Sequence, residues 1–261
     1  MLIGLSSISC FLDSSFSRCI DLLRDSKLNY IDLFLSPPHL YFDNLTSIVH
    51  QIKMTPNRDI TLTLKAPSFI ENLASIIDEI RGLTYSEYLY SLEHARKIGA
   101  RAVIIKPGMM FFSEKRCRAF VQKKFIESLY NLAEIAEKLR IYLLLENYYY
   151  PYEILRSIND FIYFTDIIAG FDYTGFALNI PHLVESGFSV SQLLSKKKVL
   201  EKIRLVYIGL CPSPWELYGD VKSASRVLKE TKNLLSTIMP EFLVIASIST
   251  PILKMLLDGL R

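Results

Sequence analysis

Two stretches, ITLTLKAPS at residues 60–68 and ARAVIIKPG at residues 100–108, share one pattern. Each is a strand-like run that ends on a lysine and is then broken by a proline. Comparable runs recur along the whole chain, at residues 2–5, 30–35, 60–64, 102–105, 141–146, 175–178, 204–210 and 242–247. Most of them are nearly continuous in Val, Ile and Leu, which is typical of parallel strands covered on both faces.

Helical segments are predicted between these runs. An apolar stripe from Val121 to Leu139, with spacings of three and four residues, predicts an amphipathic helix. Another helix is predicted to end at Gly99, just before the fourth run. Eight strand–helix units in 261 residues predict an α/β protein, a single (β/α)8 TIM barrel with residues 1–261 as one domain. The structural rival is a doubly wound open sheet, but no G-x-G-x-x-G follows the first run to support its dinucleotide-binding form.

The composition limits the classes of function. The chain has 30 Lys and Arg residues and 27 Asp and Glu residues, a net charge of +3. This near balance gives no support for a protein that coats nucleic acid. A local basic patch is still compatible with it. No apolar stretch approaches the roughly 20 residues of a membrane span. The N-terminus lacks a basic segment, so we expect no signal peptide. The four cysteines form no C-x-x-C pair, so we expect reduced thiols and a cytoplasmic location.

Several motifs, taken in order, resemble the xylose isomerase-like TIM barrels. This superfamily contains sugar and sugar-phosphate isomerases and epimerases, and also the endonuclease IV type of AP endonuclease. The resemblance spans about residues 30 to 250. Its motifs are LKAPSFIENLAS at 64–75, AVIIKPG at 102–108, LLLEN at 143–147, FALNIPHL at 176–183 and LYGDVKSASRVL at 217–228.

The resemblance implies divalent metal ions at the barrel mouth, held by His and carboxylate ligands. Of seven implied ligand positions, Glu146 and His182 keep the family residue. The other five fall at or near Lys65, Lys106, Asn179, Gly209 and Ala246. An ammonium group cannot be a ligand and repels a dication. We therefore expect that the metal site is lost and that the protein has no cofactor.

The two lysines allow several interpretations. In the structural one, each stem packs on apolar walls while the charged head reaches solvent. In the functional one, Glu146 is the shared counter-ion of Lys65 and Lys106, and the ammonium groups hold a phosphate or carboxylate. A Schiff base on one lysine, ranked below anion binding, is the chemical version.

Other polar and aromatic residues complete the candidate site. His182 is a candidate proton shuttle that would titrate near neutrality, although a lone histidine near a loop is more often structural. Asn179 and His182 are expected to hydrogen-bond sugar hydroxyls. The loop NYYYPY, which contains Asn147 and Tyr148, suits stacking on a sugar, with packing over the barrel rim as the favoured alternative. Trp215 and His39 are further ligand-binding candidates.

The sequence thus predicts a sugar or sugar-phosphate isomerase- or epimerase-like protein that binds an anionic sugar through Lys65 and Lys106. Glu146 and His182 join the two lysines as catalytic candidates, and whether a substrate is turned over stays open. One alternative is a non-catalytic scaffold or pseudoenzyme barrel. Another is an endonuclease IV-like protein acting on abasic DNA, which would need the metal cluster. The expected partner is a small sugar or sugar phosphate, not a membrane.

Overall fold

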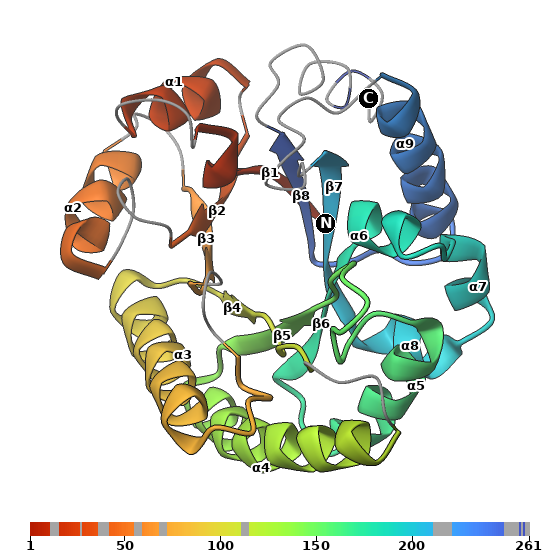
Figure 1. Ribbon diagram of the computed structural model, residues 1–261. Coiled ribbons are helices and arrows are strands. Elements are labelled where there is room, and N and C mark those ends of the chain that lie inside the picture. The colour runs from red at the N-terminus through yellow and green to blue at the C-terminus, as the bar shows by residue number, and fades with distance from the viewer. Residues whose placement is uncertain are drawn as a thin grey trace.

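The computed structural model describes residues 1–10, 16–26, 28–35, 42–54, 59–67, 72–110, 115–210, 221–247, 256 and 258. Its strands form a closed parallel barrel in the order β1 to β8, surrounded by helices (Figure 1). The strands are β1 Leu2–Ser6, β2 Tyr30–Phe34, β3 Thr61–Lys65, β4 Ala102–Ile105, β5 Tyr142–Glu146, β6 Thr174–Asn179, β7 Ile203–Leu210 and β8 Phe242–Ser247.

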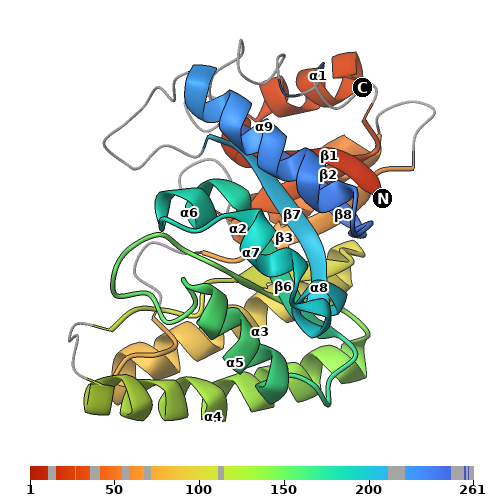
Figure 2. The same cartoon turned by 90° about the vertical axis from the view of Figure 1, so that its right-hand side faces the viewer.

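The helices follow the strands in chain order and form the outer layer of the barrel. Figure 2 shows from the side how α9 lies against β7. The helices are η1 Ser7–Cys10, α1 Ser17–Ser26, α2 Phe42–Lys53, α3 Asp78–Ile98, α4 Lys115–Leu139, α5 Ile158–Ile167, α6 Ile180–Glu185, α7 Val190–Leu194, α8 Lys197–Lys202 and α9 Val221–Leu235.

The predicted barrel is confirmed. Each of the eight predicted runs coincides with a strand, within one or two residues at its ends. The pairing of β1 with β8, from Leu2–Phe242 to Leu5–Ile245, closes the sheet and rules out the open-sheet alternative. Closure removes the sheet edges, and it directs the C-terminal ends of all strands to one mouth.

Two helix predictions are also confirmed. The apolar stripe from Val121 lies on α4, where its side chains are buried as far as Ala136. Gly99 ends α3 in the left-handed conformation, with φ of 74°, and its N–H donates to carbonyls of the last helical turn. Glycine adopts this conformation without the steric cost that a Cβ would bring.

Two apolar layers hold the barrel together. The larger one fills the space between strands and helices, and the smaller one fills the barrel interior. The interior includes the rings of Tyr30, Tyr207 and Phe242. No helix within the described residues has the length and apolar character needed to cross a membrane.

One cysteine differs from expectation. Cys19 is the only cysteine whose side chain the structure describes, and it is disulfide-bonded. The prediction of reduced thiols is therefore wrong for this residue.

Candidate functional site

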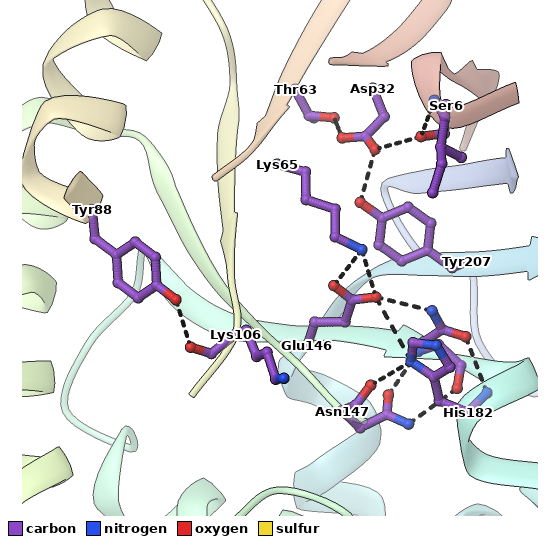
Figure 3. A network of polar contacts seen from close by, with 12 residues as sticks. Ser6, Asp32, Thr63, Lys65, Tyr88, Lys106, Glu146, Asn147, His182 and Tyr207 are labelled. Carbon is purple, nitrogen blue, oxygen red and sulfur yellow. Dashed lines mark hydrogen bonds and ion pairs between the residues drawn. The ribbon is translucent and has the colours of Figure 1, made fainter. Parts of the chain in front are cut away.

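The barrel brings the predicted polar residues to one mouth. Lys65, Glu146 and Asn179 are the last residues of β3, β5 and β6, and Lys106 directly follows β4. His182 lies in the first turn of α6. Figure 3 shows the side chains of Lys65, Lys106, Glu146 and His182, with Lys65 directed toward Glu146.

Lys65 and Glu146 form an ion pair in the mouth. The Nζ atom of Lys65 lies 2.9 Å from Oε1 and 2.7 Å from Oε2 of Glu146. The ammonium also lies 5.5 Å from the ring centre of Phe34 and 4.9 Å from that of Tyr207, within cation–π range. Burial on its own would raise the pKa of Glu146, but the Lys65 charge and the hydrogen bonds to this carboxylate together lower it. Glu146 is therefore an ionised carboxylate.

Lys106 has a different partner from the one predicted. Its Nζ lies 2.8 Å from Oε1 of Glu153, and the two side chains are 6% and 1% exposed. The rings of Tyr148 and Tyr150 lie 4.3 and 6.0 Å from the same ammonium. Among the contacts that the structure describes, Glu146 pairs with Lys65 and Glu153 pairs with Lys106. The prediction that Glu146 is the shared counter-ion of both lysines is therefore wrong.

Glu153 is a site residue that the sequence did not reveal. It lies in the loop after β5 and pairs with Met109 in an isolated antiparallel bridge, which brings it back over the end of β4. Burial raises the pKa of Glu153 to about 7, and the Lys106 charge offsets only part of that effect. The loop shows no helical or strand periodicity in its sequence. The position of Glu153 in space therefore could not be predicted, and only its separation from Glu146 along the chain was known.

The two asparagines hold the site in place. Asn179 Nδ2 donates to Glu146 Oε1 at 2.9 Å, and its Oδ1 accepts from the His182 backbone N–H at 3.1 Å, so this side chain also caps α6. Asn147 donates through Nδ2 to the Asn179 carbonyl and accepts from the Asn179 N–H through Oδ1, at 3.0 and 2.7 Å. These contacts join the ends of β5 and β6.

His182 is a buried, neutral imidazole. Its Nδ1 lies 2.9 Å from the Asn147 carbonyl oxygen, which requires Nδ1 to carry the hydrogen. The ring packs at 4.4 Å from Tyr148 and 5.2 Å from Tyr149. Burial, only partly offset by Glu146, lowers the pKa of His182 to about 4. The expectation that His182 titrates near neutrality is therefore wrong.

Asp32 extends the site into the barrel interior. Its carboxylate has no exposed surface, and it accepts hydrogen bonds from Ser6 Oγ, Thr63 Oγ1 and Tyr207 Oη, at 3.2, 2.7 and 2.9 Å. Burial raises the pKa of Asp32, while the hydrogen bond from Thr63, the Lys65 charge and the hydrogen bond from Tyr207 oppose the rise. Since Tyr207 also faces the Lys65 ammonium, Asp32 fixes the ring on which that ammonium lies (Figure 3).

The backbone has no room for a side chain at Gly209, near the end of β7. Gly209 has φ of 133°, and a Cβ there would lie 1.8 Å from the Ala246 carbonyl oxygen. A metal-binding side chain at Gly209 would require β8 to move. Two further candidates, His39 and Trp215, lie outside the described residues.

Solved structures match this chain over nearly its whole length. A D-tagatose 3-epimerase-like protein superimposes with a TM-score of 0.75 at 16% identity, covering 100% of this chain and 96% of the other. D-psicose 3-epimerase with D-tagatose from Clostridium cellulolyticum H10 gives 0.72 at 14% identity, with 100% and 97% covered. The chain has the fold of the sugar 3-epimerases. A third structure, the IolI protein with a zinc atom, gives 0.72 at 14% identity, with 99% and 95% covered.

These matches confirm the predicted (β/α)8 barrel as the fold. No family model and no curated protein matches the sequence. At this level of identity the likeness establishes the architecture of the barrel and not its chemistry.

The described residues in the barrel mouth do not fit a divalent metal. Within the part of the chain that the structure describes, no group of three or more His, Cys, Asp or Glu side chains is arranged to bind one. Both oxygens of Glu146 face the Lys65 ammonium, and Nδ1 of His182 faces a carbonyl. The arrangement instead offers two ion pairs, whose formal charges cancel, beside a neutral imidazole.

Proposed function

We propose that this chain binds a small sugar at the barrel mouth, as an isomerase- or epimerase-like protein that works without a divalent metal. The observation that carries the proposal is the ion pair between Lys65 and Glu146 at the ends of β3 and β5. The carboxylate that relatives would offer to a metal is here matched by an internal ammonium group.

Electrostatics supports the loss of the metal. A dication at this place would lie among the Lys65 and Lys106 ammonium groups, in surroundings that largely exclude water. Like charges a few ångströms apart in such a medium repel by several kcal/mol. The remaining ligand positions, Asn179, Gly209 and Ala246, supply no anionic group to offset that repulsion.

The charge balance bears on the kind of sugar. Lys65 and Lys106 each have a carboxylate within 3 Å, so a phosphate group would have to compete with Glu146 and Glu153 for the same ammonium groups. An uncharged ketose or aldose needs no such exchange, because its hydroxyls can bond to ion-pair atoms without displacing either partner. We therefore favour a neutral sugar over the anionic ligand that the sequence suggested.

Catalysis by proton transfer would depend on Glu153. Glu146 has a lowered pKa, and His182 is neutral with a pKa of about 4. Glu153, with a pKa of about 7, is suited both to accept and to donate a proton near neutral pH. The second candidate is a sugar-binding barrel without turnover, which the burial of Lys106, Glu146 and Glu153 favours because a substrate must first gain access to them.

Thermal melting and calorimetric titration test the proposal, with D-tagatose, D-fructose and D-fructose 6-phosphate as probes. We expect the neutral ketoses to bind with or without EDTA and the phosphate to bind more weakly. Lys65→Ala removes the ammonium group of the proposed site and should weaken ketose binding. Lys197→Ala, at a side chain that is 90% exposed, is its matched control. Absence of binding by every sugar, or binding only after metal addition, would contradict the proposal. Chromatography of the sugar after incubation then separates an epimerase from a binding protein.

A further inference from the structure

We infer that Lys106 forms a Schiff base with the carbonyl group of an open-chain sugar, with Glu153 as its proton acceptor and donor. The inference rests on the proposed sugar site and specifies its chemistry. The partner of Lys106 is Glu153, which lies in the loop after β5. The partner of Lys65 is Glu146, which is the last residue of β5.

The contacts of the two carboxylates separate the two lysines. Glu146 lies against the Lys65 ammonium with both oxygens and accepts hydrogen bonds from Lys65 and from Asn179 Nδ2 at Oε1, and these contacts favour its ionised form. For Glu153, the described residues provide one charged partner, Lys106, and no other side-chain donor. Fewer contacts thus stabilise the charged form of Glu153 than that of Glu146, so Glu153 is the better acceptor for a lysine proton.

The surroundings of Lys106 suit an amine nucleophile. The Lys106 main chain is fixed at the end of β4, where its carbonyl accepts from Tyr88 Oη at 2.8 Å (Figure 3). Its side chain is 6% exposed and lies under the rings of Tyr148 and Tyr150. Exclusion of water protects an imine from premature hydrolysis. The raised pKa of Glu153 allows that carboxylate to take the proton near pH 7.

The proposed steps balance without an external oxidant or reductant. Lys106 first passes a proton to Glu153, and its Nζ lone pair then attacks the sugar carbonyl carbon. Protonation of the resulting hydroxyl by Glu153 releases water and leaves a protonated C=N bond. That bond withdraws electrons from the adjacent carbon, so the Glu153 carboxylate, which is ionised again after the loss of water, can take a proton from this carbon and return it to the same enamine. Hydrolysis by one water restores the lysine amine and the carbonyl of the sugar.

This chemistry would fulfil the task that a metal performs in carbonyl activation. A divalent ion polarises the oxygen of a carbonyl, and a protonated imine stabilises the same carbanion-like state through its nitrogen. A barrel mouth with lysines in place of metal ligands could therefore still catalyse the removal and return of a proton at the carbon next to a sugar carbonyl.

Reductive trapping tests the inference on the full chain. The protein is incubated with dihydroxyacetone or D-tagatose and sodium borohydride, and the adduct is located by intact-mass and peptide mass spectrometry. We expect one reduced adduct per chain, on Lys106, and none in Lys106→Arg. In Glu153→Gln, trapping should slow by about 100-fold, the usual size of general acid–base assistance. Lys197→Arg, on the surface, should trap at the wild-type rate.

Two results would overturn the inference. One is no adduct on Lys106 with either probe, and the other is equal labelling of Lys106 and the exposed Lys197. Thermal melting of each variant shows whether it is folded, and a folded Glu153→Gln protein that traps at the wild-type rate removes the role of Glu153. Calorimetric binding of D-tagatose without any adduct would refute the Schiff base while leaving the proposed sugar site intact. Absence of both binding and adduct would refute the two together.

Discussion

The Lys65 ammonium group contacts both oxygens of Glu146, at 2.9 and 2.7 Å, and the carboxylate has no exposed surface. The two residues end β3 and β5, which are not neighbours in the sheet. In a TIM barrel, alternate strands contribute the side chains of one interior layer. Tyr207 of β7 belongs to the same set of alternate strands, and its ring faces the same ammonium.

Removal of both members of this pair should cost less than the sum of the two single removals. Lys65→Met leaves a buried carboxylate without its counter-ion, and a change of this kind destabilises by about 3–5 kcal/mol. Glu146→Gln leaves a buried ammonium and should cost a similar amount. The double variant should be more stable than the sum predicts, by at least about 1 kcal/mol in urea unfolding. Simple additivity would show that the pair is not coupled, and the exposed pair Lys197–Glu201 serves as the control cycle.

The Glu153 carboxyl should make stability depend on pH in an unusual direction. Its pKa is raised from 4.5 to about 7 in the folded chain, so the folded state holds this proton more tightly than the unfolded state. Its contribution to stability is complete below pH 4.5 and is lost as the pH rises to about 7, which amounts to about 3 kcal/mol.

The measurement compares wild type with Glu153→Gln at pH 5 and pH 7.5, by urea unfolding. The free energy of unfolding of the wild type, relative to that of the variant, should decrease from pH 5 to pH 7.5. Glu134→Gln, on the exposed side of α4, is the control and should follow the wild type. A wild-type advantage that grows with pH would contradict the buried, protonatable carboxyl.

His182 should remain neutral throughout the physiological range. Its pKa is lowered from 6.5 to about 4, so its contribution to stability is present above pH 6.5 and is lost as the pH falls through about 4. In proton NMR, its imidazole signal, identified by its absence in His182→Asn, should stay constant between pH 5.5 and 8. A titration with its midpoint near 6.5 would place the ring in water instead of beside Tyr148 and Asn147.

The barrel could be predicted because its signals are local. Continuous apolar runs mark strands buried on both faces, and Gly99 supplies the left-handed residue at which α3 ends. Once the strands are placed, barrel geometry alone brings Lys65 and Glu146 to one mouth.

The partner of Lys106 could not be predicted, because it depends on loop conformation. Glu153 reaches Lys106 only because the loop after β5 returns to β4, through the Met109–Glu153 bridge and a hydrogen bond from the Met110 N–H to the Tyr152 carbonyl. The hydrogen bond between Asp32 and Tyr207 joins residues 175 positions apart. Tyr207 lies in an apolar run that indicates a strand but no polar role.

Metal content tests the central claim most directly, namely that internal ammonium groups have replaced an inorganic cation at the barrel mouth. The protein is purified without chelators, incubated with Zn²⁺, Mn²⁺ or Mg²⁺, dialysed and analysed by inductively coupled plasma mass spectrometry. The account predicts well below one ion per chain, with no change in Glu146→Gln. One tightly held ion per chain that disappears in Glu146→Gln would contradict it.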